Sequence, residues 1–198
     1  MNNLSIEIAD DFQFGSTNKT PEFRSKFPAG KVPAFEGSDG GPYIAESDAI
    51  AQYVASSGPQ AATLLGSGVV EQAQIRQWIC FAENEVYGPM LSVVLWRVGY
   101  EAYDATKEEN GAVRLRSALE IVETQLSREN GFLVCGRLTL ADLSLASSLY
   151  WGFMHYLDEE LRHDFPHTVE WYRRIIGEER VKEVFADASF VNARRMPE

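Results

Sequence analysis

Two short motifs near the start of the chain contain residue types whose spacing indicates binding of a small peptide-like molecule. In the first, Gly30 precedes Lys31-Val32-Pro33. A Pro that opens a strand after such a turn is typical of a bend containing a cis X-Pro bond. This bend exposes the backbone N–H and C=O of Val32, which can pair with an extended peptide as a neighbouring strand would.

The second motif places a carboxylate and a hydroxyl at the expected start of a helix, in the run Glu46-Ser47-Asp48-Ala49-Ile50. Free N–H groups and the positive end of the helix dipole favour an anion there. Glu46 can take an ammonium group while Ser47 and the backbone take the adjoining carboxylate, so an α-amino acid head group fits. Alone, each motif is usually structural, a strand start or a helix cap. Their combination is far less common.

The elements that position these motifs follow from hydrophobic periodicity. Residues 4–9 alternate apolar and polar side chains, which predicts a strand with one buried face. Residues 32–35 and 43–45 are expected to form a hairpin around a turn at 38–41.

Short helices are expected on both sides of this hairpin. Thr20 is a suitable cap for a helix that begins at Pro21, and Ser47 is expected to cap a helix that runs to about Ser56.

The chain divides by composition into two parts. Residues 58–68 are rich in Gly, Ser, Pro and Ala, which is typical of a linker. We therefore expect a mixed α/β domain at 1–57, the linker at 58–68 and an all-helical domain at 69–198. The first helices of that domain are expected at 69–99, with a kink at Pro89, and at 105–128.

Composition limits the classes of partner. The 198 residues include 29 acidic and 18 basic side chains, giving a net charge of −11, so neither nucleic acid nor an anionic membrane is an expected partner. No export signal or membrane anchor is visible, and a cytoplasmic location is expected. Cys80 and Cys135 lie in apolar segments, where free, buried thiols are expected. With three scattered His and no close His/Cys cluster, no metal site is expected.

Several runs of the sequence resemble those of a known family. The runs at 14–23, 27–37 and 46–50 are similar to those of glutathione transferases, most closely to the transferase-like domain of the elongation factor 1B gamma subunit. Residues 132–142 resemble the family's capping box, in which Thr139 caps a buried helix and Asp142 returns a hydrogen bond. The resemblance implies a truncated thioredoxin-like domain, without the first strand and helix, followed by an all-helical domain, with glutathione bound between them.

The resemblance also implies which residues hold glutathione. The backbone of Val32 would pair with the cysteinyl unit, and Glu46 with Ser47 would hold the γ-glutamyl head. Positive side chains would face the glycyl carboxylate. The implied glutathione-binding residues are Lys19, Lys31, Val32, Pro33, Glu46 and Ser47, with Asn18 as a further candidate.

One departure from the family concerns the residue that activates the glutathione sulfur. The Tyr, Ser or Cys that acts on it normally follows the first strand, and this chain begins about where the second strand would lie. A thiol with a pKa near 8.5 is only about a few per cent thiolate at pH 7, so another group is needed to activate it. The candidates are Arg97, Ser5, Thr17 and a helix N-terminus, and we take Arg97 as the predicted catalytic residue.

Aromatic and sulfur-containing side chains recur at helical spacing around Pro89, where they could line a pocket for a second substrate. Packing in the core is the alternative interpretation of most of this stripe. The predicted pocket residues are Tyr87, Met90, Leu91 and Arg97. The second substrate would then be mainly apolar, with one polar or anionic group for Arg97.

Two functions remain open. The first is an enzyme that uses the glutathione thiolate on an apolar electrophile, giving a conjugate or a cis–trans isomer, in a role similar to that of tailoring members in fungal secondary-metabolite pathways. The second is a non-catalytic scaffold module of a translation elongation factor complex. The family's members are mostly two-fold dimers, so the resemblance implies a homodimer.

Overall fold

The computed structural model describes residues 2, 4–129 and 131–197. The chain forms two compact units, an N-terminal unit at Asn2–Ala62 and a helical unit at Thr63–Glu198. We describe each unit by itself. The fold is that predicted: a small sheet-containing unit followed by an all-helical one.

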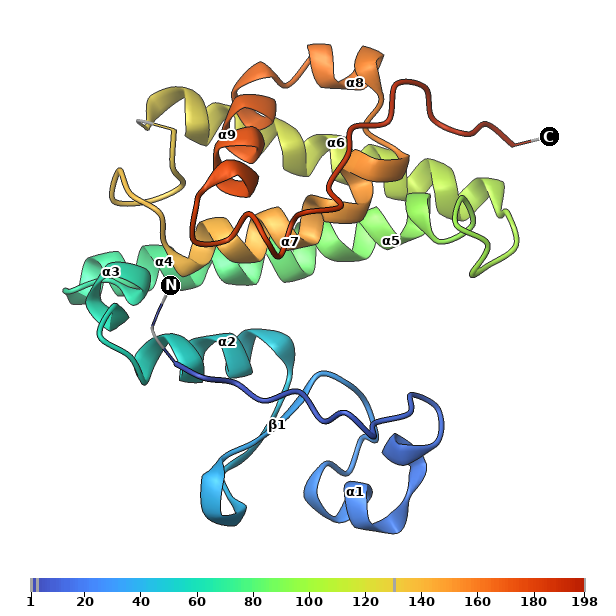
Figure 1. Cartoon of the computed structure of the whole chain (residues 1–198). Coiled ribbons are helices and arrows are strands. Elements are labelled where there is room, and N and C mark those ends of the chain that lie inside the picture. The colour runs from blue at the N-terminus through green and yellow to red at the C-terminus, as the bar shows by residue number, and fades with distance from the viewer. Residues whose placement is uncertain (1, 3, 130, 198) are drawn as a thin grey trace. The chain divides into compact units, whose positions relative to one another are not determined.

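The N-terminal unit is built on one antiparallel hairpin, in which Ala34 pairs with Ala45 and Glu36 with Tyr43. A short helix precedes the hairpin and a longer one follows it (Figure 1). The helix cap predicted at Thr20 is confirmed, since its hydroxyl accepts the Phe23 N–H at 3.2 Å. The elements are α1 (Pro21–Lys26), β1 (Ala34–Glu36), β2 (Tyr43–Ala45) and α2 (Ser47–Ser56), with single 3-10 turns at Thr17–Lys19 and Ser38–Gly40.

The strand predicted at residues 4–9 is wrong. In the part of the chain that the structure describes, this segment belongs to no sheet. Leu4, Ile6 and Ile8 are 42%, 54% and 86% exposed. Alternation specifies which face of a strand can be buried, but a strand also needs a hydrogen-bonded neighbour. Here β1 and β2 pair only with each other among the described residues.

The helical unit packs its long helices side by side. In Figure 1, α4 runs into α5 as one rod, α7 lies along it, and α6 packs against α5. Its elements are α4 (Val69–Phe81), a π-helical turn (Ala82–Tyr87), α5 (Gly88–Val94), α6 (Ala105–Arg128), α7 (Leu140–His155), α8 (Glu159–His163) and α9 (Pro166–Gly177), after α3 (Ala61–Leu65) at the boundary between the units.

The irregularity predicted at Pro89 takes the form of the π-helical turn that ends at Tyr87. Pro89 has no N–H for the carbonyl one turn earlier, and a wider turn accommodates that loss. Close packing of α5 on α6 depends on Gly111. A Cβ atom at Gly111 would lie 2.6 Å from Cβ of Ser92 and 3.2 Å from the Pro89 carbonyl oxygen.

None of the described helices has the length and apolarity needed to cross a membrane. The two cysteines are free, as expected, but the expectation that they are buried is wrong: Cys80 is exposed and Cys135 partly exposed. Apolar neighbours in the sequence do not determine which face of α4 carries Cys80.

An ion pair at the start of α4 gives a pH-dependent contact. The guanidinium of Arg137 donates to Glu71 at 2.9 Å, and the Ser67 N–H donates to the same carboxylate. The bond from Arg137, and then that from Ser67, lowers the pKa of Glu71 from 4.5 to about 2.

We predict that Glu71 titrates near pH 2 in a carbon-detected NMR titration. Its pKa is lower in the folded chain than in the unfolded one, so its contribution to stability is complete above about pH 4.5 and is lost as the pH falls toward 2. In Arg137→Gln the midpoint should move back toward 4.5. A wild-type midpoint already near 4.5 would show that the ion pair does not form in solution.

Candidate functional site

The predicted glutathione-binding residues gather at one end of the hairpin. Because Ala34 pairs with Ala45, the residue before β1 and the residue after β2 lie side by side at this end. These residues are Pro33 and Glu46, so Val32-Pro33 is brought next to Glu46-Ser47 although thirteen positions separate Pro33 from Glu46 in the sequence. We call residues 31–33 and 46–47 the hairpin-end face.

A buried side chain brings Lys19 toward the same face. Asn18 is 3% exposed; its amide donates to the Gly30 carbonyl at 2.7 Å, and its oxygen accepts the Gly15 N–H at 2.7 Å. The turn at residues 17–19 is thereby held against the residue that precedes Lys31. Asn18, the further candidate for the glycyl carboxylate, thus has one amide donor and its oxygen in bonds that hold the local backbone.

Val32 has the geometry that the motif predicts. The Val32–Pro33 peptide bond is cis, and the Val32 side chain is 43% exposed. No backbone hydrogen bond joins Val32 to another described residue. Its N–H and C=O can therefore pair with an extended ligand.

Glu46 adopts an unusual backbone conformation, with φ 70° and ψ 125°. Such positive φ values are uncommon for residues other than Gly and concentrate at functional sites. Glu46, not Ser47, occupies the cap position of α2, and Ser47 is its first helical residue. The predicted cap at Ser47 is thus wrong by one position. The consequence is that the Ser47 hydroxyl and the first N–H groups of α2 are not used by a side-chain cap.

The charges on this face have no partners within the part of the chain that is described. Glu46, Lys19 and Lys31 form no ion pair there, whereas the neighbouring Lys26 pairs with Glu36 at 2.8 Å. That hydrogen bond to Glu36 raises the pKa of Lys26. A carboxylate, the ammonium group of Lys31, a hydroxyl and free backbone groups thus belong to one hairpin end, and Lys19 follows Asn18, which is bonded to Gly30 beside it.

The predicted second-substrate residues do not share one face of the helical unit. Tyr87 is 42% exposed and Leu91 partly exposed, and four positions apart they lie on the same side of the helix. Met90 is 1% exposed, and a Cβ atom at Gly152 would lie 2.2 Å from its terminal methyl group. Met90 therefore packs against α7 in the core, as the alternative interpretation of the stripe has it.

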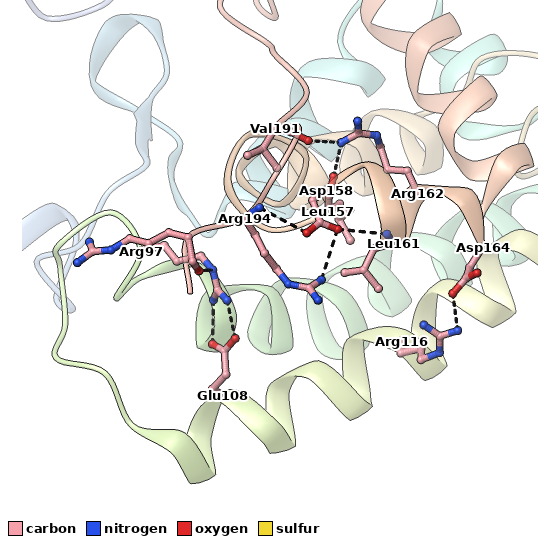
Figure 2. Close-up of polar contacts among 11 residues, drawn as sticks. Arg97, Glu108, Arg116, Leu157, Asp158, Leu161, Arg162, Asp164, Val191 and Arg194 are labelled. Carbon is pink, nitrogen blue, oxygen red and sulfur yellow. Dashed lines mark hydrogen bonds and ion pairs between the residues drawn. The ribbon is translucent and has the colours of Figure 1, made fainter. Parts of the chain in front are cut away.

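Arg97 is held inside the helical unit. Its side chain is 2% exposed and forms a two-pronged ion pair with Glu108, with N–O distances of 2.9 and 2.7 Å (Figure 2). It also donates to the carbonyls of Val93 and Arg195, and its guanidinium lies over the Trp96 ring. These contacts use the guanidinium donors that Arg97 would need to act on the glutathione sulfur. Arg97 therefore occupies a structural position, although the sequence predicts a catalytic role for it.

Two polar residues that the sequence did not single out hold chain ends in place. Asn2 donates to the carbonyls of Val54 and Ala55 at the end of α2, at 2.7 and 3.0 Å. Asp158 caps α8 by accepting the Leu161 N–H at 3.1 Å and pairs with Arg194. The sequence does contain a signal for the Asp158 cap, because an Asp followed by two Glu is typical of a helix start. Asn2 gives no such signal, since it acts across more than fifty positions.

Comparison with known proteins decides the family. A glutathione S-transferase-like protein of Aspergillus aculeatus is 57% identical over 197 residues, covering 98% of this chain and 92% of the relative. Residues 3–56 match the model for the glutathione S-transferase N-terminal domain, and residues 86–179 match that for the C-terminal domain. The chain belongs to the glutathione S-transferase family.

Solved structures agree with this membership. The transferase-like domain of elongation factor 1-gamma from Saccharomyces cerevisiae has a TM-score of 0.80 at 25% identity, covering 89% of this chain and 82% of that one. A glutathione S-transferase-I bound with lactoylglutathione has a TM-score of 0.72 at 27% identity, covering 85% and 80%. The fold of this transferase-family chain is thus shared both by a glutathione-binding protein and by an elongation factor domain.

Proposed function

We propose that this chain binds glutathione at the hairpin-end face and uses its thiol on an apolar, electrophilic small molecule. The observation that carries the proposal is the convergence of Lys31-Val32-Pro33 and Glu46-Ser47 on one hairpin end. These residues lie within the N-terminal unit.

The residues fit each part of glutathione. The γ-glutamyl head has an ammonium group, which suits the unpaired carboxylate of Glu46, and a carboxylate, which suits the Ser47 hydroxyl and the start of α2. The peptide bonds at the cysteinyl unit match the unpaired N–H and C=O of Val32. The glycyl carboxylate suits Lys19 and Lys31.

The bound thiol supplies the chemistry, adding as thiolate to an electrophilic carbon and either remaining there as a conjugate or leaving again to give a cis–trans isomer. The chain's own contribution is to hold the tripeptide by both ends and by its backbone, so that the sulfur keeps one position. Tyr87, at the end of the π-helical turn, and the partly exposed Leu91 of α5 form the surface that we assign to the second substrate. Arg97 is assigned a structural role, because Glu108 and two carbonyls hold its guanidinium.

The setting that we propose is secondary-metabolite tailoring by a cytoplasmic homodimer, on the likeness to transferase-like proteins of fungi. The alternative is a non-catalytic scaffold, as in the elongation factor whose transferase-like domain shares the fold. The unpaired charges at the hairpin end favour the enzyme, because a scaffold does not need them.

Product analysis tests the reaction. The chain is incubated with glutathione and either 1-chloro-2,4-dinitrobenzene or dimethyl maleate, and products are separated by chromatography. We expect a thioether adduct from the first, or dimethyl fumarate from the second, formed at least about tenfold faster than without protein. Recovery of both compounds at the uncatalysed rate, in a chain that binds glutathione, would favour the scaffold.

A further inference from the structure

Phe190, in the C-terminal tail after α9, packs on two aromatic residues of the helical unit, Phe153 and Tyr172, which we call the aromatic floor. The ring of Phe190 lies 5.1 Å from that of Phe153 and 5.9 Å from that of Tyr172, edge-on to both. Phe153 and Tyr172 stack on each other at 4.0 Å and are each 1% exposed. Phe190 therefore packs edge-on against a stacked aromatic pair contributed by α7 and α9.

Two guanidinium groups flank the same ring. Arg162 lies 5.4 Å and Arg173 5.0 Å from the centre of the Phe190 ring. Neither forms an ion pair with a carboxylate of the described chain, and Arg162 donates instead to the Leu157 and Val191 carbonyls. Burial, together with the charge of Arg173, lowers the pKa of Arg162.

Nearby acids balance this charge only in part. Glu159 and Asp158 act on Arg162 from the start of α8, but Asp158 is paired with Arg194 (Figure 2). In a chain with a net charge of −11, two cations without a paired carboxylate on one aromatic ring are an unusual arrangement, and they suit an anionic ligand.

The tail that carries Phe190 is held by a few separate contacts. The Val191 N–H donates to the Phe153 carbonyl at 2.9 Å, and the Glu159 N–H donates to the Asn192 carbonyl at 3.2 Å. Beyond these, Arg162 donates to the Val191 carbonyl, Arg97 donates to the Arg195 carbonyl, and Arg194 pairs with Asp158 (Figure 2). The described residues after α9 form no further helix and no strand, so the tail can open locally while the helices stay folded.

We propose that Phe190 is a plug in a latent binding site for a flat aromatic anion. When residues 190–195 lift from the surface, the ligand's ring takes the place of Phe190 on Phe153 and Tyr172. Its anionic group then pairs with Arg162 and Arg173. All of these residues lie in the helical unit, so the proposal is independent of glutathione binding at the hairpin-end face.

Equilibrium dialysis with 2-naphthoate tests this site. A plug that occupies the site lowers the apparent affinity by the fraction of open molecules, so Phe190→Ala should bind 2-naphthoate at least about tenfold more tightly than the wild type. Adding Arg173→Gln to Phe190→Ala should remove most of that gain. Val184→Ala, at a tail position that is 80% exposed, is the matched control and should bind like the wild type. Equal affinity of Phe190→Ala and the wild type, or a gain that survives Arg173→Gln, overturns the proposal.

Hydrogen exchange in the wild type gives a second test that does not depend on the folding of a variant. With 2-naphthoate near its solubility limit, the Val191 amide should exchange faster, because the tail has lifted, while amides within α7 keep their protection. If Phe190→Ala fails to fold, this measurement decides. An unchanged rate at Val191 then contradicts the plug.

Discussion

Replacing Asp142 by Ala is expected to lower the free energy of unfolding by about 4 kcal/mol, the largest effect of a single substitution that we predict. Asp142 is fully buried. One of its carboxylate oxygens accepts the Leu133 N–H and the Trp171 indole N–H, and the other accepts the N–H and hydroxyl of Thr139, all at 2.9–3.0 Å. Burial raises the pKa of this carboxyl, and the four donors oppose that rise.

The cost follows from what the substitution leaves behind. In Asp142→Ala, buried donors from the loop before α7, from the start of α7 and from α9 all lose their acceptor, and each costs about 1–3 kcal/mol when unsatisfied. Urea unfolding followed by circular dichroism measures the change. Asp164→Ala is the control, because its ion pair with Arg116 is half exposed and is worth at most about 1 kcal/mol. Equal losses in the two variants would contradict the account of Asp142.

The second large effect is expected at Glu108. Glu108→Gln should cost about 3 kcal/mol, because it leaves the Arg97 guanidinium buried without its counter-charge. The Trp96 indole N–H, which donates to Glu108 at 2.7 Å, would also lose a charged acceptor. Glu109→Gln, one position along α6 and exposed, is the control and should change stability by no more than about 0.5 kcal/mol.

A double-mutant cycle distinguishes a structural Arg97 from a catalytic one. If Arg97 is structural, Arg97→Met with Glu108→Leu should be more stable than the sum of the single changes predicts, and the double variant should retain transferase activity. Loss of activity in a double variant that folds and still binds glutathione would restore the catalytic role predicted from the sequence.

The hairpin-end face could be predicted from the sequence because its positioning is local. The Pro after Val32, the turn at 38–41 and the helix start after Glu46 are short-range signals, and antiparallel pairing of the strands between them necessarily brings their ends together. The capping box at Thr139 and Asp142 is likewise local, and it is confirmed.

What the sequence did not predict depends on contacts between distant segments. Whether Arg97 faces a pocket or Glu108 depends on how the chain turns between α5 and α6. Hydrophobic periodicity does not predict the conformation of that connection. Met90 and Leu91 are adjacent and both apolar, yet only Met90 meets Gly152 of α7. Residues 4–9 have the pattern of a strand, but pairing depends on a neighbour that the pattern does not specify.

Titration calorimetry with glutathione tests the central claim most directly. The wild type is compared with Glu46→Ala plus Ser47→Ala, and with the control Glu22→Ala plus Ser25→Ala, which removes the same residue types from α1 of the same unit. We expect binding to the wild type and to the control, and at least about tenfold weaker binding to the Glu46 and Ser47 variant. Equal binding to all three would contradict the assignment of the γ-glutamyl head to the start of α2, and no binding to the wild type would favour the scaffold function.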